Sequence, residues 1–533
     1  MVQKMLKKAW LPIIILYVAV GFLIYSNVLV DGIFVYDDFE YIVDNPLVQT
    51  LSFFEDMTDP RHIGYLSFAL NYALDGYDPY GYHLFNIIIH ITNAMLVFLF
   101  VSLVLKILRQ GDESQTAWDS LVAFSSGLIF LVHPVETQAV SYVTQRFTSL
   151  TALFYLAAVV SYLGARWRIE RSEGLFISYL LYAVSVLSCI LAMKTKEISF
   201  TAPFMLLALE YLLFRGSILS NRRYIFLIPL FATLIIIPLS LLGPEYGLIG
   251  TGQGVDEVTR RDKLFDLYQR SNYEYLLMQF RVIIIYIRLL LLPIHQLAVY
   301  DLKASHSLFE LKVLASLALL LTLAGAALAG WMRSFRTDPV HAPAYRLVSI
   351  GILWFFVTLS IESSFIPIKD VIFEHRTYLP SVGFIAAFSM LFVQAVRRFS
   401  PVQKSKAVAA VALLAIVIPL SAATYSRNFV WTDEVVFWDD IVQKTGKAIG
   451  YNNRGNAYAK KGQLELALKD LDKTISFFPD ATDKMAWENS DFTPMNMMKT
   501  YQSRGNIYAQ MGDTARAQAD FEMSRRVMGM GMQ

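Results

Sequence analysis

The chain is 533 residues long, with 55% hydrophobic and 17% charged residues. That composition, together with a positive mean hydropathy, excludes an ordinary soluble globular protein and indicates a chain that uses lipid as part of its solvent. The 46 basic and 44 acidic residues nearly cancel, so no overall charge favours a nucleic-acid partner. The single cysteine, Cys189, excludes an intrachain disulfide, and no Cys/His spacing indicates a zinc site.

The N-terminus joins basic residues to a long apolar stretch. Lys4, Lys7 and Lys8 precede residues 9–30, which have about the length of a full membrane span. No small-residue cleavage site closes this stretch, so we expect a retained first helix and not a signal peptide.

Apolar runs of spanning length recur along the chain and predict about eleven membrane helices. They lie near residues 10–30, 84–105, 119–133, 148–165, 175–192, 198–214, 224–242, 310–331, 347–366, 379–396 and 405–424. Basic residues collect at alternate ends of these runs, at Lys7/Lys8, Lys106/Arg109, Arg166/Arg168/Arg171, Arg215/Arg222/Arg223, Arg333/Arg336/Arg346 and Arg397/Arg398/Lys404/Lys406. By the positive-inside rule these ends are cytoplasmic. The predicted fold is therefore an all-α polytopic bundle over residues 1–425.

A twelfth apolar segment, residues 275–293, carries Arg281 and Arg288 on one helical face. A crossing here would reverse the sidedness of every later basic loop. We therefore expect a re-entrant or interfacial helix inside an outer loop of residues 243–309. The GTGQG stretch that begins at Gly250 has no preceding strand, so we interpret it as a flap over the site and not as a nucleotide-binding loop.

Residues 426–533 form a polar C-terminal domain that contains two similar segments. These segments start at Tyr451 and Tyr501, and both show the small, Gly and aromatic positions of a tetratricopeptide repeat. Two repeats bury little core, so we expect the domain to need the membrane body or a partner chain. The alternatives are a peptide-binding or oligomerising module with a protein partner, and a stabilising lid.

The first outer loop, residues 31–82, is strongly acidic. Asp37 and Asp38 are adjacent, about one turn beyond the first span, and Glu40 follows them. Neighbouring carboxylates at a membrane surface raise at least one pKa by repulsion and desolvation, which suits a general base or a cation ligand. They could hold Mg²⁺ or Mn²⁺; alternatively, the charge is solvated surface.

Several cationic residues interrupt apolar sequence on the same predicted outer side. Ionisable groups at membrane depth are expensive and rarely face lipid, and arginine binds phosphate through two charge-assisted hydrogen bonds. We therefore predict a clamp for a lipid phosphate; the alternative is a set of interfacial anchors. The candidates are Arg146, Lys196, Arg281, Arg288, His375 and Arg376.

Other polar residues of these segments are candidates for acceptor binding or for loop structure. His133 opens HPVE at the end of the third run, where a capping or core role is as plausible as catalysis. The remaining candidates are Glu40, Arg61, Glu136 and Glu374. No third ligand at metal spacing accompanies His83 and His90, so no zinc site is predicted.

An ordered set of motifs resembles a known family over nearly the whole chain. The set is FVYDDFEYIVDNPLVQ, YLSFALNYALDGYDPYGYHLFNIIIHITNAMLV, HPVETQAVSYVTQR, KTKE, EHRTYLPSVGF and RNFVWTDEVVFWDDIV running into the repeats. It is similar to the transmembrane and tetratricopeptide-repeat O-mannosyltransferases and to bacterial membrane proteins of the same build. Two departures are Arg61-His62, where the family pattern has arginine followed by proline, and KTKEIS, a loose match to a lysine-glutamate-glutamine pattern.

The resemblance implies a clan C glycosyltransferase that uses a polyprenyl- or dolichyl-phosphate sugar, with mannose or another hexose as the sugar. It implies that Asp37 and Asp38 supply the base, that Arg376 and Arg146 contact the lipid phosphate, and that no metal is needed. The acceptor would be a protein Ser or Thr hydroxyl, with inversion at the sugar. The site and the repeats would face the periplasm from a bacterial inner membrane or, equally well, the lumen of the endoplasmic reticulum.

Three other functions remain open at the level of the sequence. A glycan or a lipid could replace the protein as acceptor. A transporter or flippase for a lipid-linked precursor would need charged residues along a path through the bilayer, whereas here they crowd one end of the helices. A non-catalytic scaffold that presents its repeats would leave the acidic loop as plain surface.

Overall fold

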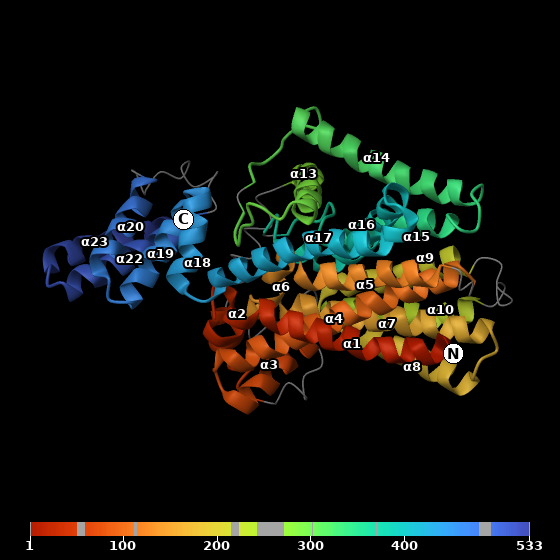
Figure 1. The fold of residues 1–533 in the computed structure, drawn as a ribbon. Helices are drawn as coiled ribbons and strands as arrows, with labels where there is room; N and C mark the ends of the chain where they lie inside the picture. Colours follow the sequence, from red (N-terminus) through yellow and green to blue (C-terminus); the bar gives the residue numbers. More distant parts are fainter. Residues whose placement is uncertain are drawn as a thin grey trace. The chain divides into compact units, whose positions relative to one another are not determined.

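The structure is a computed structural model, and it describes residues 2–50, 59–110, 115–214, 223–241, 271–300, 302–368, 370–478 and 492–531. It divides into two compact units, of which the first comprises residues 1–296 and 302–428 and the second residues 297–301 and 429–533 (Figure 1). Part of the acidic loop, residues 51–58, and the predicted GTGQG flap lie outside the described residues.

The described residues of the first unit form helices joined by loops. Its α-helices are α1 Val2–Ile24, α2 Ser26–Asp31, α3 His62–Asp75, α4 Pro79–Leu108, α5 Thr116–Val132, α6 Thr137–Val140, α7 Arg146–Glu170, α8 Leu175–Met193, α9 Ala202–Leu213, α10 Arg223–Ala232, α11 Ile236–Leu241, α13 Asn272–Leu291, α14 Leu311–Ser334, α15 Ala342–Leu359, α16 Tyr378–Phe399 and α17 Ser405–Asn428. Short π or 3₁₀ turns are η1 Phe39–Val43, η3 Pro134–Glu136, η4 Val143–Gln145, η5 Glu197–Thr201, η6 Thr233–Ile235, η7 Glu374–Thr377 and η8 Val402–Lys404.

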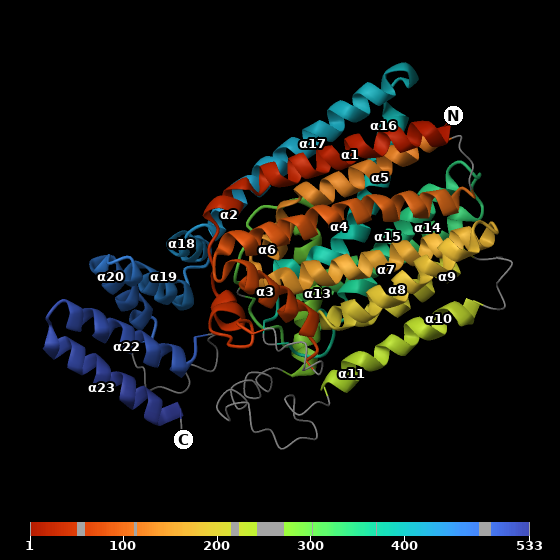
Figure 2. The same ribbon diagram turned by 90° about the horizontal axis from the view of Figure 1, so that it is seen from below.

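The long helices of this unit run roughly along one axis (Figures 1 and 2). The helices α2, α3 and α6 lie at one end of the bundle, and the N-terminus of α1 lies at the other. We call the first of these the α3 end. The helix α4 starts at the α3 end and finishes with Lys106 in its last turn, and α7 likewise finishes with Arg168. Basic residues therefore mark the end away from α3.

Among the described residues, seven helices are long and apolar enough to cross a membrane, or eight if the bent pair Thr116–Val132 and Pro134–Val140 is one span. The prediction of eleven such spans is therefore too high by this measure. Of the three other predicted runs, the first lies in the 23-residue helix α1, of which the part Leu11–Ile24 is counted as apolar here. The other two form shorter helices, the 12 residues of α9 and Ile225–Ser240. Pro229 and the 3₁₀ turn η6 interrupt the last of these runs, because a proline removes a helix hydrogen bond.

The helix α13 has a different orientation from the candidate spans. It starts with a capping box between Ser271 and Glu274 and ends at Leu291. Figures 1 and 2 show it crosswise to the long helices. That orientation is the one expected of an interfacial helix.

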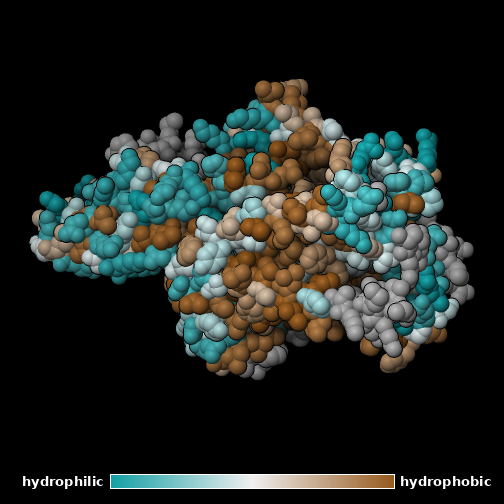
Figure 3. Space-filling view, viewed as in Figure 1, coloured by the Kyte–Doolittle hydropathy of each residue, from teal (hydrophilic) through white to brown (hydrophobic). Residues whose placement is uncertain are grey.

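Small residues allow two helices of the bundle, α15 and α16, to pack closely. A Cβ on Gly351 of α15 would lie 2.4 Å from the carbonyl oxygen of Gly383 on α16, so only glycine fits at this crossing. Next to it, the Trp354 indole N–H donates to the Leu379 carbonyl at 2.9 Å. Hydrophobic residues cover much of the face of this unit seen in Figure 3, as expected for a surface in contact with lipid.

The second unit contains paired helices. They are α18 Glu434–Thr445, α19 Ala448–Lys460, α20 Leu464–Ser476, α22 Pro494–Gln510 and α23 Thr514–Gly531, preceded by the 3₁₀ turn η9 Phe429–Trp431. Gly462 and Gly512 turn the chain within the two pairs α19–α20 and α22–α23, with φ of +74° and +83°, a conformation that glycine adopts at little cost.

The same ion pair occurs in both repeats. Arg454 binds Asp470 at 2.7 and 2.8 Å, and Arg504 binds Asp520 at 2.8 and 2.7 Å. Each arginine also reaches back to the preceding helix, at 2.6 Å, to Asp439 from Arg454 and to Asp472 from Arg504. The repeats thus share polar contacts as well as their glycine pattern.

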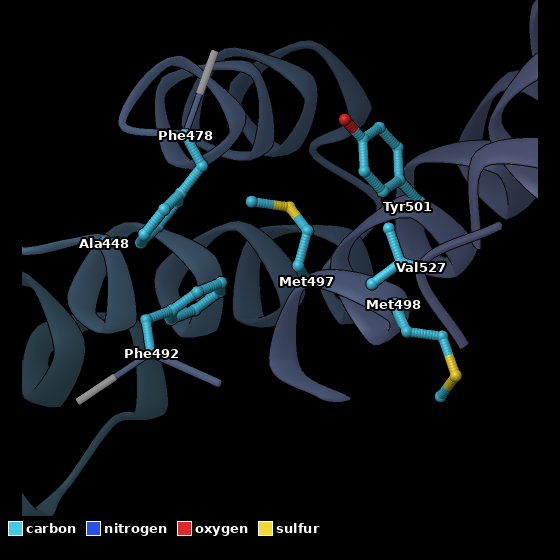
Figure 4. Close-up of a cluster of buried hydrophobic side chains, with 7 residues drawn as sticks. All are labelled: Ala448, Phe478, Phe492, Met497, Met498, Tyr501 and Val527. Atoms are coloured by element: carbon cyan, nitrogen blue, oxygen red, sulfur yellow. The ribbon is translucent and has the colours of Figure 1, made fainter. Parts of the chain in front are cut away.

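The core of this unit includes a cluster of seven buried residues from both repeats (Figure 4). Met497 and Tyr501 of α22 contribute to it, and the rings of Phe478 and Phe492 stack at 5.4 Å between centroids. Burial of such side chains contributes about 1.5–3 kcal/mol each. The cluster therefore holds the second repeat against the first.

Candidate active site

Asp38 is completely buried at the α3 end of the bundle. Its Oδ2 accepts a hydrogen bond from the Val35 N–H at 3.0 Å, and its Oδ1 accepts one from the Thr144 N–H at 2.7 Å and one from the Thr144 hydroxyl. Burial raises the pKa of Asp38 to about 7, although these hydrogen bonds oppose the shift. The side chain predicted as one of two catalytic carboxylates is thus an internal anchor of the first loop.

Asp37 is partly exposed, in contrast to its neighbour. Tyr36, immediately before it, has a φ of +53°, a left-handed conformation that costs a residue with a Cβ about 1–3 kcal/mol. The Asp37 N–H donates to the Tyr142 hydroxyl at 3.0 Å. Burial raises the pKa of Tyr142, and the charges of Asp37 and Asp38 raise it further. A neutral phenol therefore holds the backbone of Asp37 in a strained turn.

Arg146 is also completely buried. Its Nε donates to Asn86 Oδ1 at 2.6 Å, its Nη1 to Asn71 Oδ1 at 2.6 Å and to the Ser67 carbonyl at 3.0 Å, and its Nη2 to the Tyr82 carbonyl at 3.0 Å. Its guanidinium is also surrounded by the rings of Phe68, Tyr82 and Phe85. The interpretation of Arg146 as a phosphate ligand does not fit this arrangement, because the arginine is already bound to the fold.

Together these contacts make residues 142–146 a support for the first loop. Tyr142 binds Asp37, Thr144 binds Asp38, and Arg146 binds α3 and the start of α4. Tyr142 and Thr144 were missed by the sequence analysis, although both lie within the HPVETQAVSYVTQR motif. We call this set of contacts the anchoring cluster.

A second buried group contains Lys196, Glu362 and Arg376, which are 8%, 7% and 4% exposed. Lys196 Nζ lies 2.8 Å from Glu362 Oε1 and donates to the Thr148 hydroxyl at 3.0 Å. Arg376 Nε lies 4.0 Å from the same carboxylate oxygen. We call these residues, with Thr148, the cationic cluster. Glu362 and Thr148 were not predicted, and only their position at the ends of apolar runs could have indicated them.

The hydrogen bonding of the cationic cluster is incomplete. Arg376 donates from Nη1 to the Val371 carbonyl at 3.1 Å and from Nη2 to the Asp370 carbonyl at 2.7 Å. Its buried Nε has no hydrogen-bond partner, and neither has Glu362 Oε2. A buried polar atom without a partner is unfavourable by about 1–3 kcal/mol. These two atoms therefore mark a position where a polar ligand would be favourable.

Arg61 and Glu197 form a bidentate pair, with Arg61 Nε and Nη2 at 3.2 and 3.3 Å from the carboxylate oxygens. The Glu197 charge raises the pKa of Arg61. Burial raises the pKa of Tyr41, Arg61 lowers it, and the charges of Asp37 and Glu197 raise it again. Asp37 and Arg61 therefore both lie within electrostatic reach of the Tyr41 hydroxyl.

His375 lies within electrostatic range of both Arg61 and the cationic cluster. Its ring stacks on Phe373 at 5.0 Å between centroids, and its backbone N–H donates to Gln138 Oε1 at 2.8 Å. It interacts electrostatically with Lys196, Arg376 and Arg61. The structure thus brings Asp37, Arg61, Lys196, His375 and Arg376 to one region at the α3 end.

The other predicted site residues lie elsewhere or are engaged differently. Arg281 donates to the Lys303 carbonyl at 2.9 Å, and Arg288 and Glu40 are exposed. His133 is buried with Nε2 at 3.1 Å from the Leu290 carbonyl, and Glu374 accepts from Gln296 Nε2 at 2.8 Å. Glu136 is completely buried within the bundle. Arg281, His133 and Glu374 thus bind other segments of the fold.

In the described part of the chain, no group of three or more His, Cys, Asp or Glu side chains could hold a metal ion. Asp38 directs both carboxylate oxygens to the protein's own donors. The carboxylate of Asp38 is thus already engaged by hydrogen bonds within the protein.

Fold and site together define a helical membrane protein that has multiple candidate spans, a polar cluster at one end of them and tetratricopeptide repeats. The tetratricopeptide-repeat family model matches residues 448–480 and 499–522, which confirms the predicted repeats. No solved structure matches the chain.

The chain is a distant homologue of protein O-mannosyl-transferases. It is 34% identical to one of Caenorhabditis elegans over 25% of this chain and 21% of that protein. It is 32% identical to Tmtc1 of Drosophila melanogaster over 34% of this chain and 21% of that protein. Human TMTC3 is 23% identical over 95% of this chain and 54% of its own length. The chain thus matches at most about half the length of these relatives, and the predicted bacterial source stays a prediction.

Proposed function

We propose that the protein is a membrane glycosyltransferase that moves a sugar, mannose or another hexose, from a polyprenyl-phosphate donor to an acceptor hydroxyl outside the cytoplasm. The acceptor class is a protein Ser or Thr. The observation that carries the proposal is the presence of an accessible carboxylate, Asp37, and a buried cationic cluster at the same end of the bundle. The relatives named as protein O-mannosyl-transferases support the same class.

In the proposed mechanism Asp37 is the base. Its carboxylate takes the proton of the acceptor hydroxyl as that oxygen attacks the anomeric carbon of the sugar. The new carbon–oxygen bond forms as the bond from the anomeric carbon to the phosphate oxygen breaks, which inverts the centre. The electron pair of the broken bond goes to the phosphate.

The leaving lipid phosphate gains negative charge, and Lys196 and Arg376 are the groups that would stabilise it. Such preorganised cations act strongly because they are already desolvated. Asp38 and Arg146 would contribute indirectly, because they hold the loop that presents Asp37. In this mechanism the active site lies on the extracytoplasmic side, since the basic helix ends mark the cytoplasm.

The direct test is purified protein in detergent with a polyprenyl-phosphate mannose and an extracytoplasmic acceptor protein. We expect release of free polyprenyl phosphate and, by mass spectrometry, a hexose on Ser or Thr of the acceptor. Asp37→Asn protein is the control and should give neither product. Sugar transfer at equal rates by the Asp37→Asn and parent proteins would contradict the proposal.

Hexose transfer to a glycan or lipid in place of the protein would keep the class of enzyme and change the acceptor. Mass spectrometry of extracytoplasmic proteins from cells with and without this chain separates these outcomes. A protein acceptor predicts a hexose that disappears from defined peptides when the chain is absent.

A further inference from the structure

The cationic cluster contains its own anion. Glu362 lies beyond the end of α15, in a non-helical segment, and its Oε1 is 2.8 Å from Lys196 Nζ. Arg376, the second cation, is 4.0 Å from the same oxygen, beyond hydrogen-bond distance. The carboxylate therefore offsets one of the two positive charges of the cluster, and it is within hydrogen-bond distance of Lys196 only.

We propose that Glu362 occupies the phosphate position of the donor pocket in the empty protein and is displaced when the lipid-linked phosphate binds. This inference rests on the proposed function. The ligand chemistry is a phosphate ester, and the residues that would receive it are Lys196, Arg376 and Thr148.

The unsatisfied atoms favour this exchange. A planar carboxylate leaves Arg376 Nε and its own Oε2 without hydrogen bonds in the buried cluster. The oxygens of a phosphate point in tetrahedral directions, so one group can meet an ammonium, a guanidinium and a hydroxyl together. Replacement of Glu362 by phosphate would therefore satisfy Arg376 Nε and release Glu362 Oε2 to water.

The position of Glu362 allows such a movement. Its carboxylate has one close partner, Lys196, whereas the buried carboxylate of Glu210 within the bundle makes three hydrogen bonds, to Tyr162 and Arg166. The segment around Glu362 is also held by a long contact, from the Tyr275 hydroxyl to the Glu362 carbonyl at 3.4 Å. Few interactions of its side chain are lost when it leaves the cluster.

The exchange also explains why two cations can remain buried in the empty protein. An unpaired buried charge is strongly destabilising. In the empty protein Glu362 supplies the negative charge that pairs with Lys196, and the phosphate of the donor would supply it once bound. A neutral lipid lacks the charge to compete with Glu362, so the same residue would select phosphorylated lipids over the corresponding alcohols.

The experiment measures the Kd of purified protein for polyprenyl phosphate, for inorganic phosphate and for the unphosphorylated polyprenol. Glu362→Gln removes the competing charge, and we expect polyprenyl phosphate to bind about tenfold tighter. Glu362→Asp shortens the side chain and keeps the charge, so it should bind with intermediate affinity. Glu274→Gln is the control, because it removes a partly exposed carboxylate of α13 that pairs with His306 and not with Lys196 or Arg376, and it should leave the Kd unchanged.

The three ligands identify the source of the phosphate. Tighter binding of polyprenyl phosphate alone indicates a lipid headgroup site, and tighter binding of inorganic phosphate as well indicates a site for the anion itself. Polyprenol should bind equally to all variants. In transfer assays, the donor KM should fall in parallel with the Kd, and free polyprenyl phosphate should become a stronger inhibitor.

Unchanged or weaker phosphate binding by folded Glu362→Gln protein would mean that Glu362 is a permanent counter-ion. If Glu362→Gln does not fold, unchanged or weaker binding by Glu362→Asp protein carries the same conclusion. Sugar transfer by the parent protein is measured separately. Transfer without tighter binding in the variants refutes the role of Glu362 alone, whereas absence of both transfer and phosphate binding in the parent refutes the proposed function.

Discussion

The two buried polar clusters at the α3 end differ in how completely they satisfy their own charges. In the anchoring cluster, Arg146 donates to four acceptors on the protein and Asp38 accepts three hydrogen bonds. In the cationic cluster, Arg376 Nε and Glu362 Oε2 have no partners. Equally buried ions thus have different uses: a satisfied one stabilises a loop, and an unsatisfied one leaves room for a ligand.

The adjacent aspartates give the largest predicted contrast. Asp37→Asn removes the proposed base, and we expect transfer to fall by about 10²–10⁴-fold with an unchanged melting temperature. Asp38→Asn should lower the melting temperature and transfer together, because it weakens the anchor of the loop. Glu40→Gln, an exposed change in the same loop, should alter neither quantity. Full transfer by the Asp37→Asn variant would show that Asp37 is not the base, and the proposed difference in role between Asp37 and Asp38 would be wrong.

The two arginines test the same comparison through one conservative change. Arg376→Lys should reduce transfer by about 10–100-fold, because it removes the Nε–H at the proposed ligand position. It should lower the melting temperature less than Arg146→Lys does, because only two backbone carbonyls, those of Val371 and Asp370, lose a donor. Arg146→Lys should destabilise the protein by roughly 2–4 kcal/mol, because several buried acceptors lose their donors. The opposite pattern in melting and transfer assays would show that the roles of the clusters are reversed.

The pH dependence of stability should reveal the buried carboxyl of the anchoring cluster. Burial raises the pKa of Asp38 from 3.8 to about 7, so between these values the unfolded chain loses this proton while the folded protein keeps it. Stability should therefore decrease as pH rises from about 4 to about 7, by an amount on the order of a few kcal/mol, and then level off. Melting curves of parent and Asp38→Asn proteins measure this, and the slope should be absent from the variant.

The smallest predicted change concerns one hydrogen bond of the anchor. Thr144→Val keeps the shape of the side chain and removes the hydroxyl that donates to Asp38. We expect a loss of about 1–2 kcal/mol in the free energy of unfolding, with Thr144→Ser close to the parent. Equal melting temperatures for the Val and Ser variants would show that the backbone N–H groups of Val35 and Thr144 hold Asp38 without the hydroxyl.

Hydropathy and charge predicted the helical character of both units, since apolar length and the alternation of basic ends depend on residues close together in the chain. They overestimated the number of full spans, because hydropathy does not register how proline and 3₁₀ turns shorten a helix, as around Pro229. The repeats were predictable because Gly455 and Gly505 recur at a fixed spacing.

The site was predictable only in part. Arg146 and Arg376 look alike in the sequence, as single cations in apolar surroundings, and their difference depends on whether distant residues supply acceptors. Asn71 and Asn86 do so for Arg146. Likewise the contact between Asp38 and Thr144, which are 106 positions apart in the sequence, could not be predicted, because hydropathy reports the depth of a residue in the membrane and not its direction around the helix axis.

The recurring arginine of the repeats has a consequence for how the C-terminal unit could be extended. Arg504 donates a hydrogen bond to Asp472. Asp472 lies two residues beyond Asp470, which binds Arg454. A shift by the repeat spacing of 50 places Glu522 at the corresponding position of α23. Glu522 now pairs with Arg526 of its own helix at 2.5 Å. A further helical pair added in register would place its own arginine next to the Glu522 carboxylate. The same arginine–carboxylate pair would then join each added repeat to the repeat before it.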